Sequence, residues 1–403
     1  MNITQHHTSL LEISVLAQQR SQTLIRYINN EIQQAKTHSI SFARFMEMAL
    51  YEPQLGYYTS DRNKLGEKGD FITAPELSPL FAHCLGRQWQ QLSMDLGGGD
   101  ILEIGAGTGQ LAADLLLFLE QANSLPRRYL IFEISPDLKQ RQQLRLQSRI
   151  PHLFSLIEWL EVLPVEPLQG MILANEVVDA LPVHRFVWED GDIQEMQVVA
   201  CAQKDSGKPG APFGWEKRPL CSASLRENLR QLQAEHFPQS TRYVSELALY
   251  ADTWLASVNK VLGQGLILII DYGYTAAEYY HVDRCDGTLM CYHQHRGHAN
   301  PFVLVGLQDI TASVNFSSLA YSALRVDLNV AGFTSQAAFL LNNGLLQEAE
   351  KCYNRLSAVD VNRQLHYLLS HNEMGELVKV MGLTRGYTNK LCGFISYDKK
   401  VRL

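Results

Sequence analysis

The sequence lacks the features of several large classes of protein. It has no cluster of Lys and Arg, and 35 basic residues against 42 acidic ones leave a formal net charge of −7. A nucleic-acid partner, which is bound by neutralising its phosphates, is therefore not expected. The longest apolar runs, such as Leu266–Ile270, fall far short of the roughly 20 residues that cross a bilayer. Insertion in a membrane is not expected either.

Paired cysteines are absent as well. The seven cysteines are scattered, odd in number and without a Cys-x-x-Cys pair, so the sequence indicates neither a disulfide framework nor a zinc ribbon. A reducing compartment fits this usage best. The first 19 residues contain no Lys or Arg, unlike a secretory or transit segment. These features together predict a cytoplasmic protein, and they do not indicate its oligomeric state.

Short apolar strands alternate with amphipathic helices through the middle of the chain. The predicted strands are 101–104, 129–132, 154–157, 171–174 and 265–270. The main predicted helices between them are 111–119, 136–147 and 243–261. This alternation is typical of a parallel sheet covered by helices on both faces. We therefore expect an α/β fold with a doubly wound, Rossmann-like sheet and a helical N-terminal segment.

Two segments interrupt the alternation. Residues 183–200 are predicted to form a hairpin around the turn Asp190-Gly191, and residues 204–220, rich in Gly, Pro and Lys, to form a surface loop. The final segment 392–397 is predicted to be an edge strand. We accordingly divide the chain into N-terminal helices with a glycine-rich loop (1–95), an inserted hairpin and loop (183–241), and a core made of 96–182 and 242–403.

The strongest local signal is the segment Leu102-Glu103-Ile104-Gly105-Ala106-Gly107-Thr108-Gly109, which joins a strand to a helix. Glycines in such a turn let the backbone approach a ligand closely, beside the N–H groups and the positive dipole end of the helix. The next strand ends in Glu133, where a carboxylate can accept hydrogen bonds from the hydroxyls of a ribose. The two features together indicate a cofactor that contains adenosine.

Details of the turn decide between cofactors. The dinucleotide fingerprint needs a third glycine at position 110, which is Gln110. The spacing is instead G-x-G-x-G after the acidic Glu103, which resembles class I S-adenosylmethionine (SAM) methyltransferases. A carboxylate there suits an ammonium group better than a pyrophosphate, and no P-loop sequence occurs. We expect SAM as the cofactor and S-adenosylhomocysteine as its product; a glycine-rich turn without a ligand is the alternative.

Polar residues follow the fourth predicted strand, in the segment Asn175-Glu176-Val-Val-Asp179. Ligands of open α/β sheets bind in the crevice at the carboxyl ends of the strands. Two carboxylates and an amide there can hold a substrate nitrogen and direct its lone pair at a methyl group. We therefore predict that Asn175, Glu176 and Asp179 are catalytic. In the alternative interpretation, Asp179 caps a helix and Glu176 pairs with Arg185.

Further motifs extend over most of the chain. They are Tyr51-Glu-Pro-Gln-Leu-Gly-Tyr-Tyr58, the segment 66–78, the stretch 175–186, Asp271-Tyr-Gly273, Gly287-Thr-Leu289, Gln308-Asp-Ile-Thr311, the segment 332–336 and Met374-Gly-Glu376. In this order they resemble the MidA-like SAM-dependent methyltransferases, the family of the mitochondrial complex I assembly factor 7. The chain departs from the family at Asn315, where an acidic residue is frequent.

The resemblance implies a class I methyltransferase that transfers a methyl group by direct SN2 displacement to an arginine side chain of a protein. Two alternatives remain open: a methyltransferase for small molecules, and a non-catalytic SAM-binding assembly factor. We expect the cofactor to contact four segments: Gly69, Asp70, Phe71 and Thr73 as a closing lid; Glu103, Gly105, Ala106, Gly107 and Gly109; Glu133 and Ile134; and Trp159, beside the adenine. The alternatives are a surface Ω-loop for the lid segment, with Asp70 as a turn residue, and a core position for Trp159.

Three histidines, His293, His295 and His298, invite a metal hypothesis. Their spacing brings them onto one zinc ion only if the backbone turns suitably and a fourth ligand arrives. Solvated or hydrogen-bonded histidines explain the cluster more simply. We expect no metal site.

Overall fold

The computed structural model of the protein describes residues 14–60, 73–201, 211–236, 242–353 and 357–403. Its largest sheet has a parallel part of five strands, which continues into two further strands at one edge. The order across this sheet is β4 (Ile157–Leu160), β3 (Tyr129–Phe132), β2 (Asp100–Ile104), β5 (Leu168–Asn175), β10 (Leu262–Tyr274), β16 (Val378–Arg385) and β15 (Asn329–Ser335). Strand β16 runs antiparallel to both β10 and β15. This is the predicted doubly wound sheet, and its topology is that of a class I methyltransferase.

Both faces of the sheet are apolar, and helices cover each of them. Along β10, the buried Leu266, Leu268 and Ile270 belong to one core cluster, while Ile267 and Ile269 belong to a second cluster on the opposite face. The covering elements of the first face are α4 (Pro79–Leu96), α5 (Gln110–Gln121), α6 (Pro136–Arg149), α11 (Gln336–Asn342), α12 (Leu345–Cys352) and α13 (Ala358–Leu369). Helices α8 (Leu249–Val261) and α10 (Phe316–Arg325) cover the second face. Each fully buried aliphatic side chain stabilises the fold by about 1.5–3 kcal/mol.

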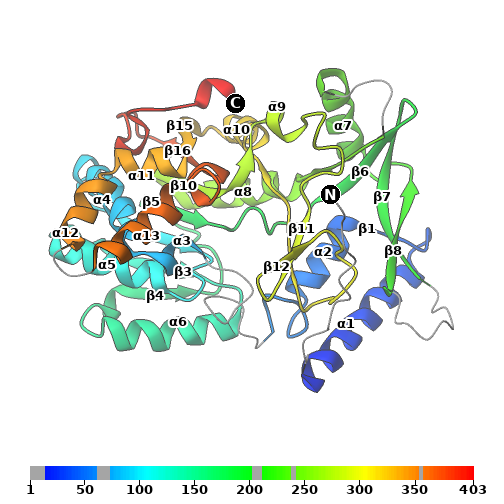
Figure 1. The fold of residues 1–403 in the computed structure, drawn as a ribbon, viewed down its shortest axis with the longest axis horizontal. Coiled ribbons are helices and arrows are strands. Elements are labelled where there is room, and N and C mark those ends of the chain that lie inside the picture. The colour runs from blue at the N-terminus through cyan, green and yellow to red at the C-terminus, as the bar shows by residue number, and fades with distance from the viewer. Residues whose placement is uncertain (1–13, 61–72, 202–210, 237–241, 354–356) are drawn as a thin grey trace.

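A second sheet lies beside the first, on the right in Figure 1. Its strands are β1 (Ile40–Ser41), β7 (Asp192–Ala200), β6 (His184–Glu189) and β9 (Tyr243–Leu247), with β8 (Phe213–Arg218) paired to β7. The predicted hairpin is confirmed: β6 and β7 pair antiparallel, and Asp190 and Gly191 both have positive φ in the turn between them.

Aromatic residues join the N-terminal helices to this second sheet. Helix α1 (Val15–Gln34) leads into α2 (Phe42–Tyr51), and Phe42 and Phe45 of α2 contact the rings of Trp215 and Phe213 on β8. Helix α7 (Ala223–His236) follows β8 in the chain. The N-terminal segment is therefore packed on the inserted strands, although four strands of the main sheet (β2, β3, β4 and β5) lie between them in the sequence.

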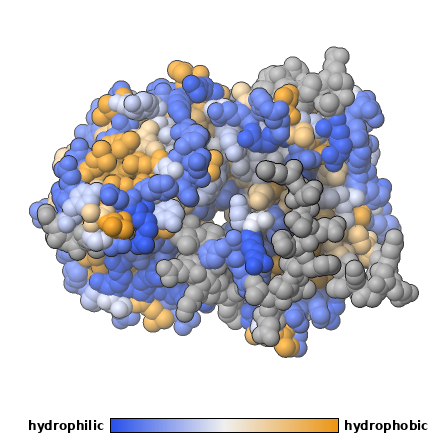
Figure 2. All heavy atoms as spheres, viewed as in Figure 1, coloured by the Kyte–Doolittle hydropathy of each residue, from blue (hydrophilic) through white to orange (hydrophobic). Residues whose placement is uncertain are grey.

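A small third sheet stands between the two larger ones, in yellow at the centre of Figure 1. It consists of β12 (Arg296–His298), β11 (Met290–His293) and β13 (Asp309–Thr311). Strand β14 (Val314–Asn315) belongs to the main sheet, where it pairs parallel with the end of β10. The remaining short elements are α3 (Ala74–Leu77), α9 (Ala276–Tyr279), α14 (Met374–Leu377) and the 3-10 turns 154–156, 392–394 and 400–402. Figure 2 shows this face of the molecule hollowed near its centre. Within the described part of the chain, none of the helices is both long and apolar enough to cross a membrane.

Four predicted elements need correction. The predicted strand 154–157 is mostly a 3-10 turn, and the true strand β4 begins at Ile157. The first residues of the predicted helix 243–261 form strand β9 instead. The strand was missed because Ser245 and Glu246 are both buried, so its sequence does not alternate between apolar and polar residues. Part of the predicted loop 204–220 is strand β8. The predicted edge strand 392–397 begins with a 3-10 turn, and β16 and β15 take its place in the sheet.

Candidate active site

The glycine-rich turn follows β2 at the carboxyl edge of the main sheet. Gly105 and Gly107 have φ values of +69° and +54°, a region that side chains with a Cβ atom rarely adopt. A Cβ on Gly105 would lie 3.1 Å from Cγ2 of Val177. Gly109, also at positive φ, forms the N-cap of α5. The turn therefore needs glycine both for its backbone angles and for the space beside it.

Two carboxylates flank this turn, and each has a buried polar partner. The hydroxyl of Tyr129 donates to Oε2 of Glu103 at 2.8 Å. Burial raises the pKa of Glu103 to about 7, against the opposing effect of that hydrogen bond. Glu133, at the end of β3, accepts hydrogen bonds from the backbone N–H of Ser135 and from Nε2 of Gln142, both at 2.9 Å.

Gln142 of α6 connects three parts of the site. Besides Glu133, its Nε2 donates to the carbonyl of Gly107 at 2.9 Å, and its Oε1 accepts from the indole N–H of Trp159 at 3.0 Å. The side chain is fully buried, so its hydrogen-bonding groups have no access to bulk water. Gln142 was not predicted from the sequence, because the helix that carries it is dense in Gln, Arg and Lys.

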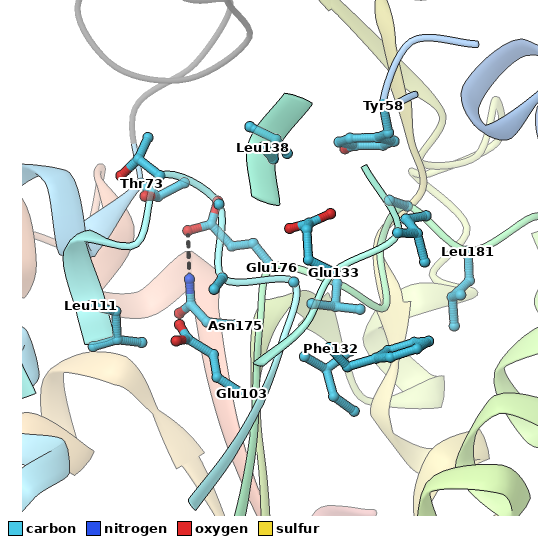
Figure 3. Close-up of a pocket in the computed structure, with 18 of the residues that line it drawn as sticks. Tyr58, Thr73, Glu103, Leu111, Phe132, Glu133, Leu138, Asn175, Glu176 and Leu181 are labelled. Carbon is cyan, nitrogen blue, oxygen red and sulfur yellow. Dashed lines mark hydrogen bonds between the residues drawn. The ribbon is translucent and has the colours of Figure 1, made fainter. Parts of the chain in front are cut away.

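The turn and the two carboxylates line a first cavity of about 400 Å³. Of the predicted site residues, it brings together Thr73, Glu103, Gly105, Ala106, Gly107, Glu133, Ile134, Asn175 and Glu176. In Figure 3, the labelled Glu103, Asn175 and Glu176 gather on one side of the cavity, and Tyr58 lies on the other. The same cavity is also lined by aromatic residues that were not predicted: Tyr51, Tyr58, Phe132, Tyr250 and Trp254.

Three of the predicted residues that the structure describes do not line this cavity: Asp179, Gly109 and Trp159. Asp179 lies in a neighbouring cavity, described below, and Gly109 packs against Gln142 of α6. Trp159 donates a hydrogen bond to Gln142, which in turn contacts Glu133 and Gly107 of the site. Gly69, Asp70 and Phe71, the predicted lid, lie outside the described residues. Tyr250 and Trp254 face the cavity from α8, and their spacing of four residues on one helix is the signal that could have identified them.

The turn after β5 is held by a buried carboxylate from β10. Oδ2 of Asp271 accepts hydrogen bonds from the backbone N–H groups of Val177, Val178 and Asp179 at 3.1, 2.8 and 3.2 Å. Glu176 precedes these residues with φ +53°, a conformation that costs about 1–3 kcal/mol in a residue other than glycine. Asp271 therefore stabilises the turn that directs Glu176 into the cavity.

Carboxylates gather around this turn. Burial raises the pKa of Glu176 to about 8 and that of Asp271 to about 7, and it raises the pKa of Asp179 well above its usual value. Repulsion from Asp271 acts in the same direction on Glu176 and Asp179. In the described part of the chain, none of the three lies within 4.0 Å of a basic nitrogen. Arg185 pairs instead with Glu246 (3.5 Å), so the alternative pairing of Glu176 with Arg185 is wrong.

A second cavity of about 460 Å³ adjoins the first. Among the described residues, it shares only Tyr58 and Glu176 with the first cavity. Its other lining residues include Asp179, Tyr272, Tyr274, Arg284, Gly287, Thr288, Leu289, Met290, Tyr292, Asp309, Thr311, Ser313 and Leu377. The site therefore has two chambers, and Glu176 stands where they meet.

The histidines of the metal hypothesis lie on the β11–β12 hairpin. Nδ1 of His293 is 2.9 Å from the carbonyl oxygen of Leu307, and His295 stands in the turn at φ +59°. In the described part of the chain, the one group of ligand-type side chains close enough to share an ion is His184, Glu195 and Cys221. It does not include these histidines.

Comparison with known proteins agrees with this geometry. A family model for S-adenosyl-L-methionine-dependent methyltransferases matches residues 80–334. The chain belongs to this family. Its methyl donor is SAM, and the resemblance to MidA-like methyltransferases stated from the motifs is confirmed.

Proteins that are similar to this chain over most of its length support the family assignment. The human protein arginine methyltransferase NDUFAF7, mitochondrial, is 26% identical over 395 residues, which cover 88% of this chain and 81% of the human one. Its Drosophila melanogaster homolog is 28% identical over 330 residues, or 75% and 71% of the two chains. A crystal structure from Burkholderia thailandensis, bound to S-adenosyl-homocysteine, is 36% identical with a TM-score of 0.90 and covers 98% of this methyltransferase and 100% of that chain.

The comparisons correct one prediction. A cytoplasmic location was expected from the cysteines and the N-terminus, and that prediction is wrong, because the named relatives from insect to human are mitochondrial proteins. The low content of basic residues near the N-terminus was the misleading signal.

Proposed function

We propose that this methyltransferase methylates the guanidinium group of an arginine side chain in a protein. The observation that carries the proposal is the second cavity, lined by carboxylates and joined to the first at Glu176. A guanidinium is cationic at all physiological pH values and presents planar N–H donors that match carboxylates. The arginine methyltransferase activity named for the relatives points to the same acceptor.

The first cavity suits SAM because it has carboxylates for the polar groups of SAM and a glycine turn that leaves room for it. The carboxylate of Glu133 at the end of β3 is positioned to accept hydrogen bonds from ribose hydroxyls, and the glycine turn leaves room for close approach of the cofactor. The carboxylate of Glu103 can pair with the ammonium of the methionine part. When bound, SAM supplies an electrophilic methyl group on a sulfonium.

The residues of this chain then contribute binding and orientation. Glu176 and Asp179 accept hydrogen bonds from the guanidinium and concentrate its positive charge on the nitrogens that face them. This leaves the lone pair of the remaining nitrogen more available for in-line attack on the methyl carbon. The new N–C bond replaces the methyl–sulfur bond, and the proton that this nitrogen gives up passes to the carboxylate of Glu176 or Asp179. Asn175, whose Nδ2 donates to Glu176 at 3.3 Å, orients the Glu176 carboxylate. Holding the two reactants in line is the largest contribution that such a site can make.

The amino acid that receives the methyl group tests the proposal. The protein is incubated with methyl-tritiated SAM and a cell extract, after which precipitated protein is hydrolysed and its labelled amino acids are separated. We expect labelled methylarginine with the wild type and little with Glu176→Gln. Label in small soluble compounds would replace the proposal by a small-molecule methyltransferase. SAM binding without any labelled product would indicate a non-catalytic assembly factor.

A further inference from the structure

We propose that Asp309 is a third carboxylate of the acceptor site and that Tyr58 is the positioning residue that holds it. The inference rests on the proposed function, since it concerns the same acceptor. Neither residue was among the predicted site residues, although both belong to motifs that resemble the family.

The hydroxyl of Tyr58 is directed at the Asp309 carboxylate. It lies 2.9 Å from Oδ1 and 3.1 Å from Oδ2. Burial, and next the charge of Asp309, raise the pKa of Tyr58 well above its usual value. The hydroxyl therefore stays protonated at physiological pH and can only donate to the carboxylate.

Asp309 is itself fixed by the backbone. It is the first residue of β13, where it pairs in register with Tyr292 of β11, and its side chain is almost fully buried. Its Oδ1 also accepts the N–H of Ile310 at 2.9 Å. The carboxylate nevertheless lines the second cavity, so a ligand there would meet it in a set orientation.

The ring of Tyr58 is held as firmly as its hydroxyl. It stacks on Tyr51 with ring centroids 5.5 Å apart and planes 17° apart, and Tyr57 packs against it edge-on at 5.1 Å. The Tyr51 hydroxyl donates to the carbonyl of Ala180 at 2.9 Å. The stack thus ties the segment after α2 to the turn that carries Glu176 and Asp179.

Carboxylates from two distant segments therefore face the same chamber. Glu176 and Asp179 come from the turn after β5, and Asp309 comes from β13. A guanidinium has N–H donors along several edges of its plane, and it can bind carboxylates on more than one edge. Tyr58, which lines both cavities together with Glu176, forms the wall beside which the methyl group would pass.

The experiment uses methylguanidinium chloride as the probe for the acceptor. Full-length protein saturated with S-adenosylhomocysteine is titrated with it by calorimetry, as the wild type, Tyr58→Phe and Asp309→Asn. The matched control is Tyr387→Phe, which removes another tyrosine–aspartate hydrogen bond (to Asp95, 2.6 Å) away from both cavities. N-Methylurea serves as the neutral probe of the same shape.

We expect the wild type to bind methylguanidinium and not N-methylurea. Tyr58→Phe should weaken this binding about tenfold, because it removes the hydrogen bond that orients the carboxylate, and Asp309→Asn should weaken it by more, because it removes the carboxylate itself. Because Tyr58→Phe keeps the ring that lines both cavities, the loss of methylguanidinium affinity should exceed any change in affinity for S-adenosylhomocysteine, whereas a merely structural role would weaken the binding of both ligands alike. Tyr387→Phe should resemble the wild type.

Two outcomes would overturn the inference in different ways. If the wild type binds methylguanidinium and Tyr58→Phe binds it equally well, Tyr58 does not position the acceptor site, and the proposed function survives. If the wild type does not discriminate methylguanidinium from N-methylurea, the arginine acceptor fails together with this inference. Should Asp309→Asn not fold, Tyr58→Phe, which keeps the ring and its packing, decides alone.

Discussion

The two chambers of the site are built differently. In the first, the carboxylates of Glu103 and Glu133 each accept a hydrogen bond from a buried side chain, Tyr129 and Gln142 respectively. In the second, Glu176 and Asp179 lie close to other carboxylates, and burial raises the pKa of both. The polar groups of the first chamber are paired before its ligand arrives, whereas the second holds crowded carboxyl groups whose ionised form a cationic ligand would favour, although Arg284 also lines this chamber.

This difference supports the proposed places of the two ligands. A preformed chamber with satisfied polar groups suits a cofactor that is bound in every cycle. A chamber of crowded carboxylates disfavours neutral ligands, and its electrostatic repulsion is relieved when a cation binds. Selectivity for the acceptor would then come from charge, and selectivity for the cofactor from shape. The predictions below test the two chambers separately, from the largest expected effect to the smallest.

Gly105→Val should abolish binding of SAM to the first chamber. The substitution adds a β-branched side chain at φ +69°, with Cβ 3.1 Å from Val177. We expect the dissociation constant, measured by calorimetry, to rise at least 100-fold. Gly97→Val is the control, since Gly97 has a similar φ of +71° and no atom within 4 Å of its added Cβ. Equal loss of binding in both variants would mean that backbone strain, and not the cavity, is responsible.

Glu176→Gln should lower the rate of methyl transfer much more than it lowers the affinity for SAM. Removing the charge at the junction should lower the rate of methyl transfer about 100-fold, which corresponds to roughly 2.7 kcal/mol of transition-state stabilisation. SAM affinity should change by less than about threefold. Glu350→Gln, on the exposed side of α12, should behave as the wild type. A variant that transfers methyl groups at the normal rate would remove Glu176 from the mechanism.

Gln142→Met should weaken the binding of SAM without changing the rate of methyl transfer. Methionine fills a similar volume but removes the hydrogen bonds to Glu133, Gly107 and Trp159. We expect KM for SAM to rise about tenfold while kcat stays within twofold. Gln147→Met, at an exposed position of the same helix, separates this effect from a change in helix stability. A fall in kcat with an unchanged KM would contradict the positioning role of Gln142.

The stability of the unliganded protein should depend on Glu176 and on pH. The folded pKa of about 8 exceeds the ordinary value of 4.5, so the folded state binds the extra proton between these values. The contribution of this group to stability is complete below pH 4.5 and is lost as the pH rises to 8. Thermal unfolding should therefore show a smaller loss of Tm from pH 5 to 8 in Glu176→Gln than in the wild type. Identical pH dependence would show that Glu176 is not buried as described.

The first chamber was largely predictable from the sequence, and the second was not. Glu103, the glycines and Glu133 lie within one strand–helix–strand unit, so local spacing alone brings them together. The second chamber combines Tyr58, Asp179 and Asp309, which are far apart in the chain, and the turn that carries Asp179 is held by Asp271 from yet another segment. Nothing local in Asp271-Tyr-Gly273 indicates that its carboxylate holds the turn 177–179. Only the register of β5 and β10 brings the two segments together.

The fold likewise divides into elements that local sequence patterns predict and elements that depend on distant segments. Strands β2, β3 and β5 are short apolar runs buried in the parallel sheet, and their positions were predicted within a few residues. Strand β9 and strand β16 were missed, because each buries polar residues, such as Glu246 and Lys379, that conceal a strand pattern. Glu246 is buried through a partner in another segment, since it accepts from Thr288, whereas Lys379 pairs with Glu376, three residues earlier in the chain.

The most direct test of the central claim is a crystal structure with S-adenosylhomocysteine and methylguanidinium bound together. The claim is that donor and acceptor occupy separate chambers that meet at Glu176. It predicts the sulfur in the first cavity and the guanidinium in the second, with the Glu176 carboxylate in contact with the guanidinium. A guanidinium bound away from Glu176, or a cofactor that fills both cavities, would contradict the account.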